Sequence, residues 1–184
     1  MRFKNVLNSL LVLSVLFVSE RPSRAGDVDA LAALRTKVDA GLRILNDPDL
    51  KRVERRAEKE AKLWQLAQQL FDYPTMSRLV LGSRWHDFTP RQQEGLVSAF
   101  AGFLRRAYMP RLLERYNGET LYFDQPLQLS PSRAEVAVYV IWSGRKIPFS
   151  VNMIRRQGDW KIYDVSALGV SAIKNYRAQF RWLL

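Results

Sequence analysis

The sequence of 184 residues contains no cysteine. Without cysteine the chain can form neither a disulfide framework nor a metal site built from thiolates. It also has a single histidine, so a zinc or iron site would have to combine one imidazole with carboxylates, and a Ser-His-Asp set could be assembled only around that residue. This residue, His86, stands between Trp85 and Asp87 just before a helix cap. We therefore expect it to be an exposed loop histidine without a chemical role.

Other signatures of function are also missing. No glycine-rich phosphate loop follows a predicted strand, and no pair of carboxylates stands in a recognisable catalytic frame. The aromatic residues follow the apolar period instead of alternating with basic residues on one sheet face, as they would in a binder of single-stranded nucleic acid. We therefore expect no enzyme activity, no cofactor, no metal and no nucleic-acid partner.

The amino terminus lacks an apolar run long enough to cross a membrane. Arg2 and Lys4 precede an almost uncharged run over 6–18, whereas a transmembrane helix needs about 20 apolar residues. A basic start, a short apolar stretch and the small-residue site Ser23-Arg24-Ala25 are typical of a secretory signal. We expect cleavage near Ala25, which makes 1–25 a signal peptide and 26–184 a single domain located in the periplasm; an uncleaved membrane anchor is the alternative.

The composition is strongly basic. The chain has 29 basic and 18 acidic residues, and removal of the predicted signal leaves 25 and 17, a net charge of +8. Such a surface attracts anions, and an exported protein meets anionic lipid head groups and acidic protein surfaces first. The run over 51–60 mixes both signs at steps of three and four, which is typical of a solvated helix face.

The first half of the mature chain has helical periodicity. Apolar residues recur at steps of three and four from Asp27, and Asn46-Asp47-Pro48 ends that helix. A longer helix is predicted from Asp49 to about Tyr73, and a short one over 75–81. The sequence Thr89-Pro90-Arg91-Gln92 combines a capping box with proline at the first helical position, which predicts the start of the next helix. Pro110 should kink or break that helix, and Asn117-Gly118 should end its continuation.

From Glu119 the apolar period changes to two, which indicates strands. We predict a first strand over 121–126, then strands over 134–142, 147–155 and 160–165 joined by tight turns, and a final helix over 170–180. Helices followed by strands indicate an α+β fold in which helices pack on an antiparallel four-stranded sheet, with a closing C-terminal helix.

Several blocks carry a family resemblance. Phe71-Asp72-Tyr73, the segment 76–82, Trp85 and Thr89-Pro90 resemble the conserved blocks of the toluene-tolerance, or MlaC, family of periplasmic phospholipid-binding proteins. The segments 158–165, 169–171 and 175–180 are similar to that family's closing motif in order and spacing. The chain departs from the family at Leu168, where an acidic residue is frequent, and at Val151, where an aromatic residue is common.

The resemblance implies a monomeric carrier that holds phospholipid in an apolar cavity between helices and sheet. It implies transfer between an inner-membrane ABC transporter complex and an outer-membrane lipoprotein complex, which would maintain outer-membrane lipid asymmetry. We expect the cavity to be lined by apolar residues of both layers: Met76, Val80, Phe100, Phe103, Leu104, Tyr108, Val136, Val138, Val140, Val151, Met153, Ile162, Val165, Val170 and Ile173. Trp85, Trp160 and Tyr176 are expected to anchor the packing.

Several alternatives stay open from the sequence. The same residues could simply fill a core, because a helical stripe and alternating strand residues are its ordinary content. Arg177 could meet a lipid phosphate at the cavity mouth or form a surface salt bridge. The lipid could be a hopanoid or another polycyclic lipid, because aliphatic walls select by shape and volume. The chain could also be a periplasmic interaction module without a lipid.

Overall fold

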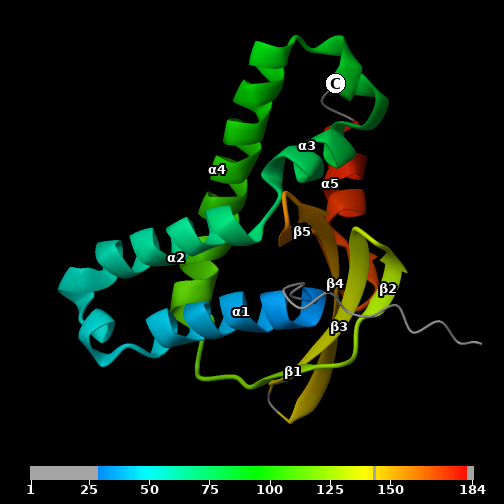
Figure 1. Ribbon diagram of the computed structural model, residues 1–184. Coiled ribbons are helices and arrows are strands. Elements are labelled where there is room, and N and C mark those ends of the chain that lie inside the picture. Colours follow the sequence, from blue (N-terminus) through cyan, green and yellow to red (C-terminus); the bar gives the residue numbers. More distant parts are fainter. Residues whose placement is uncertain (1–28, 143, 182–184) are drawn as a thin grey trace, which may run out of the picture.

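The computed structural model describes residues 29–142 and 144–181, so the predicted signal peptide lies outside the described part. The fold is α+β, as predicted, with helices in the first half and an antiparallel sheet in the second (Figure 1). The described elements are α1 (Ala30–Asn46), η1 (Pro48–Lys51), η2 (Val53–Arg55), α2 (Arg56–Leu70), α3 (Tyr73–Leu81), η3 (Gly82–Asp87), α4 (Pro90–Arg115), β1 (Leu121–Phe123), β2 (Leu127–Ser130), β3 (Arg133–Trp142), β4 (Arg145–Arg156), β5 (Asp159–Ala167), β6 (Val170–Ser171) and α5 (Ala172–Phe180). No helix in this part of the chain is both long and apolar enough to span a membrane.

The sheet has six strands, two more than predicted. The segment expected to be one strand forms β1 and β2, which pair with different halves of β3, and the two residues of β6 pair with β5. Val170 was predicted to begin the last helix, but it is in β6, and α5 begins at Ala172 after Ser171 caps it. The prediction of four strands was wrong because strands of two to four residues carry too little periodic signal.

Two predicted helices differ from the structure. The second helix was expected to start near Asp49, but η1 and η2 fill 48–55 and α2 begins only at Arg56.

The capping box predicted at the start of α4 is confirmed. The Thr89 hydroxyl accepts from the Gln92 backbone N–H, and the Gln92 side chain accepts from the Thr89 backbone N–H. Pro110, however, does not end α4, which continues as one helix to Arg115. A proline removes a single hydrogen bond, and the neighbouring turns retain theirs.

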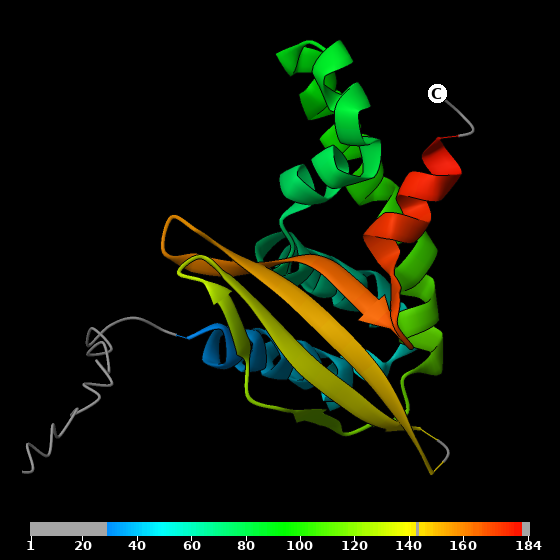
Figure 2. The same ribbon diagram turned by 90° about the vertical axis from the view of Figure 1, so that its right-hand side faces the viewer.

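One face of the sheet forms the main core. Ala134, Val136 and Val138 of β3 are buried, as predicted, with Ala134 and Val136 at 0 % exposure, and Met153 of β4 is also at 0 %. These residues pack against α1 in what we call the sheet cluster: Ala30, Leu31, Ala33, Leu34, Ala134, Val136, Val138, Val151, Met153, Trp160 and Ile162. In Figure 2 the strands face the viewer and α1 and α2 lie behind them. Each large aliphatic side chain buried here contributes about 1.5–3 kcal/mol to folding.

A second set of buried residues lies among α3, α4 and α5. We call it the helical cluster: Tyr73, Met76, Val80, Phe100, Ile173 and Tyr176. Phe71, at the α2–α3 junction, packs against both clusters and forms a backbone bridge with Ile162 of β5. The molecule therefore has two apolar centres that meet at this junction.

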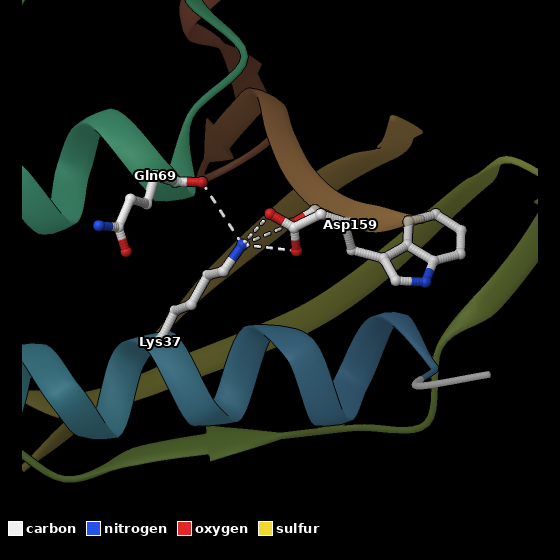
Figure 3. A network of polar contacts seen from close by, with 4 residues as sticks. Lys37, Gln69 and Asp159 are labelled. Atoms are coloured by element: carbon white, nitrogen blue, oxygen red, sulfur yellow. Dashed lines mark hydrogen bonds and ion pairs between the residues drawn. The ribbon is translucent and has the colours of Figure 1, made fainter. Parts of the chain in front are cut away.

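Polar groups hold the helices to the β4–β5 turn. Lys37 of α1 pairs with Asp159 at 2.9 Å and donates to the carbonyl groups of Trp160 and Gln69, so one ammonium joins α1, α2 and β5 (Figure 3). Next to Phe71 in the chain, the Asp72 backbone N–H donates to the carbonyl of Ile162 in β5 at 2.8 Å, which ties the start of α3 to the sheet.

Candidate functional site

The structure divides the predicted lipid-contacting residues between the two clusters. Five residues from the strands belong to the sheet cluster, and Val165 packs against it: Val136, Val138, Val151, Met153 and Ile162. Val140 is half-buried on β3. Met76, Val80, Phe100 and Ile173 belong to the helical cluster, with Leu104 packed against it. Their role in lining a lipid cavity stays a prediction.

The remaining three predicted residues are exposed. Phe103 is 38 %, Tyr108 50 % and Val170 63 % exposed. Leu112, one turn beyond Tyr108 on α4, is 40 % exposed, and Leu168 in the β5–β6 turn is 68 % exposed. We refer to the exposed residues Phe103, Tyr108, Leu112, Leu168 and Val170 together as the open seam. Phe103 and Tyr108 of α4 contact Tyr176 of α5, Leu112 follows them on α4, and Leu168 and Val170 shortly precede α5 in the chain. The predicted lipid-contacting set does not include Leu112 or Leu168, because apolar character alone does not show whether a side chain is covered.

Aromatic contacts form the closed end of this seam. The ring of Tyr176 lies edge-on to Phe100 and Phe103, with ring centroids 5.7 and 5.5 Å apart. Its hydroxyl lies 2.8 Å from that of Tyr108. Burial, and next this hydrogen bond, raise the pKa of Tyr176, so its hydroxyl stays protonated at physiological pH. Tyr176 is thus a packing anchor, as expected, and Trp160 is buried at 4 % exposure; Trp85 is only half-buried.

Arg177 has a structural role that the sequence analysis did not anticipate. Its guanidinium donates through Nε and Nη2 to the carbonyl of Leu79, in the last turn of α3. A cation at this position stabilises the C-terminal end of a helix, where carbonyl groups lack partners. Arg177 therefore ties α5 to α3 by hydrogen bonds to a carbonyl group instead of by a surface salt bridge. Its contact with a lipid phosphate stays a prediction.

Basic charge concentrates on the helices around the seam. Residues 73–118 and 172–181, which hold α3, η3, α4 and α5, contain ten basic and three acidic residues, a net charge of +7. The other described residues contain 15 basic and 13 acidic residues, a net charge of +2. We call 73–118 with 172–181 the basic region. Its charge makes the side of the molecule that carries most of the open seam the more attractive one for anions.

The carboxylate of Asp72 links helix α3 of the helical cluster to strand β4 of the sheet. Its carboxylate accepts from the Thr75 backbone N–H at 3.0 Å, from the Thr75 hydroxyl at 2.7 Å and from Arg156 Nε at 3.2 Å. Burial favours the neutral acid, but the hydrogen bonds from Thr75 and Arg156 together outweigh it and lower the pKa of Asp72. The carboxylate caps α3 and ties that helix to the end of β4.

Two grooves open on the surface apart from the seam. One, of about 640 Å³, lies between α2 and α4, and the other, of about 470 Å³, lies between the 48–55 segment and the end of α4. None of the predicted lipid-contacting residues lines either groove. Within 29–142 and 144–181 no group of histidine and acidic residues is arranged to hold a metal ion. His86 is exposed in η3.

Comparison with known proteins identifies the family. The family model described as MlaC protein matches residues 35–184. A solved structure of a phospholipid-binding protein from Ralstonia solanacearum, in complex with a phospholipid, is similar with a TM-score of 0.69 at 26 % identity, covering 84 % of this chain and 86 % of that chain. A de novo designed protein with a curved β-sheet matches 40 % of this chain and 61 % of its own length, at TM-score 0.27 and 12 % identity, which is too weak a likeness to support an argument. The family model spans most of the chain, and the chain therefore belongs to the MlaC protein family.

Proposed function

We propose that this protein is a monomeric periplasmic carrier of phospholipid. The observation that carries the proposal is the similar fold of a phospholipid-binding protein whose solved structure contains the lipid, over 84 % of this chain. In this proposal the signal peptide is removed near Ala25, and the mature protein moves lipid between an outer-membrane lipoprotein complex and an inner-membrane ABC transporter complex. It would thereby help to maintain outer-membrane lipid asymmetry.

The lipid chains are proposed to enter at the open seam and to lie between the two clusters. Exposed apolar side chains that continue a buried core mark a surface that gains stability when it is covered. A lipid with two chains has on the order of 30 methylenes to hide, each contributing about 0.8 kcal/mol when removed from water. The predicted strand residues would form one wall, and the predicted residues of α3, α4 and α5 the other. Separation of the walls would start at the seam, where Phe103, Tyr108 and Val170 are already uncovered.

The basic region is proposed to guide docking on acidic partner surfaces. Exposed charges act over about 8 Å at physiological salt, so this attraction should weaken as ionic strength rises. Transfer needs neither nucleotide nor metal in this protein. Net direction would come from the transporter's energy supply or from the different lipid affinities of the partners.

Organic-solvent extraction of the protein, purified from its native host, tests this function. We expect mass spectrometry to recover phospholipid in stoichiometric amount. Recovery of only polycyclic lipid would replace phospholipid with hopanoid-type lipid as the cargo. An extract without lipid, from protein that also fails to take lipid from vesicles, would favour an interaction module instead.

A further inference from the structure

The α2–α4 groove has two unlike walls. Glu60, Trp64 and Gln68 recur at steps of four along α2, so they line one face of that helix. The α4 wall includes the small residues Ser98, Ala101 and Gly102, whose side chains fill little of the groove. The volume of about 640 Å³ falls within the ~300–1,000 Å³ typical of small-molecule sites.

Two arginines of α4 lie at the groove, and they differ in their partners. Arg105 donates through Nε and Nη2 to Glu60 Oε1 at 3.1 and 2.8 Å, and its guanidinium carbon lies 5.3 Å from the centre of the Trp64 ring. Its charge is therefore compensated within the wall.

The charge of Arg106, in contrast, has no carboxylate partner among the described residues like the one that Glu60 provides for Arg105. It is exposed, and no carboxylate within 29–142 or 144–181 pairs with it. A Cβ added at Gly102 would lie only 3.3 Å from Nη1 of Arg106, so the guanidinium lies against the backbone of Gly102, at the groove wall. The groove thus combines one uncompensated cation with the apolar surfaces of Trp64 and Ala101.

We propose that the α2–α4 groove binds a single-chain anionic amphiphile, such as an alkyl carboxylate, at a site separate from the open seam. Arg106 would contact the anionic head, and the alkyl chain would lie along Trp64 opposite Ala101 and Gly102. A guanidinium forms charge-assisted hydrogen bonds with carboxylate or phosphate oxygens, which gives the site its preference for anions. None of the open-seam residues lines the groove, so the proposal does not depend on the proposed phospholipid function.

Calorimetry with laurate, below its micelle concentration, tests this site in the mature protein. Arg106→Glu should weaken laurate binding by about tenfold or more, because attraction becomes repulsion, and should not weaken binding of dodecyltrimethylammonium. Gly102→Leu should abolish binding by filling the groove. The matched control is Arg115→Glu, which makes the same charge change on α4 outside the groove and should bind laurate as the wild type does.

A bromoalkyl carboxylate locates the chain, since bromine quenches a nearby indole. Quenching should be lost in Trp64→Phe. The proposal is overturned if wild-type protein binds no laurate, or if Arg106→Glu and Gly102→Leu both bind laurate as the wild type does. Phospholipid extraction of the same variants separates the two proposals: a chain that binds laurate at the groove but carries no phospholipid refutes the carrier function and leaves this site standing.

Discussion

At the scale of single residues, Phe103 is the sharpest probe of the proposed lipid path. Met153 is predicted to contact lipid too, but it is at 0 % exposure in the sheet cluster, so a charge there would unfold the protein. Phe103 is 38 % exposed and can accept a carboxylate without the same loss. We expect Phe103→Asp to reduce phospholipid recovered per protein by at least about tenfold, since a charge near the acyl chains costs several kcal/mol.

Ile141 provides the matched control for this test. It is 41 % exposed, nearly the same as Phe103, but lies on β3, away from the open seam. Ile141→Asp should carry lipid as the wild type does. Equal lipid content in Phe103→Asp and the wild type would rule out entry at the open seam.

Asp72 is the residue whose charge should matter most for stability. Its pKa is lowered in the folded state, so its contribution is fully present above the unfolded value of about 3.9 and is lost as pH falls through the lower folded value. Asp72→Asn should reduce the free energy of unfolding by about 1–2 kcal/mol at pH 7, because the ion pair with Arg156 is lost and the cap is weakened.

Urea unfolding at pH 7 and pH 3 measures this effect. The difference between the variant and the wild type should shrink at the lower pH, because the Asp72 carboxylate of the unfolded wild-type chain takes up a proton there more readily than that of the folded chain. Asp39→Asn, at an exposed position of α1, should change stability little at either pH. A difference that stays constant with pH would show that the charge of Asp72 does not contribute.

At the scale of secondary-structure elements, helix α4 continues through an internal proline, Pro110. Pro110 is exposed and interior to a helix of 26 residues. We expect Pro110→Ala to raise the free energy of unfolding by about 1–3 kcal/mol, because alanine restores an N–H donor and relieves the ring's clash with the preceding turn. Pro90→Ala is the control, since proline at the first helical position costs nothing and should give no gain. Loss of stability in Pro110→Ala, measured by urea unfolding, would mean that the proline is required by packing.

At the scale of the whole molecule, the rate of lipid exchange with the transporter should depend more on where the basic residues lie than on the net charge. We compare two triple variants with the same change in net charge. One reverses Arg78, Arg91 and Lys174 in the basic region to Glu, and the other reverses Arg52, Arg133 and Arg145 outside it. All six residues are exposed.

Exchange of fluorescent lipid with transporter-bearing vesicles measures the difference. At low salt, the first variant should exchange at least about tenfold more slowly than the wild type, whereas the second should be nearly unaffected. The difference should shrink at high salt, where exposed charges are screened. Equal slowing in both variants would mean that net charge alone sets the rate.

Local signals in the sequence determined much of the fold. The alternation through Ala134, Val136 and Val138 identified the buried face of β3, because a side-chain period of two requires only the local backbone. The Thr89 capping box fixed the start of α4 for the same reason, since all its partners lie within four residues. Pro110 is the limit of such reasoning, since its local preference to break a helix did not prevail.

Only the tertiary structure decided which apolar residues have a neighbour to cover them. Phe100 and Phe103 share one helix and look alike in the sequence, yet contacts with α5, some 70 positions further along the chain, leave one buried and the other 38 % exposed. The concentration of basic charge also depends on α5 lying beside α3 and α4. Periodicity shows which side chains need cover, but the packing of distant elements determines whether they receive it, because the hydrophobic effect is non-directional and specifies no partner.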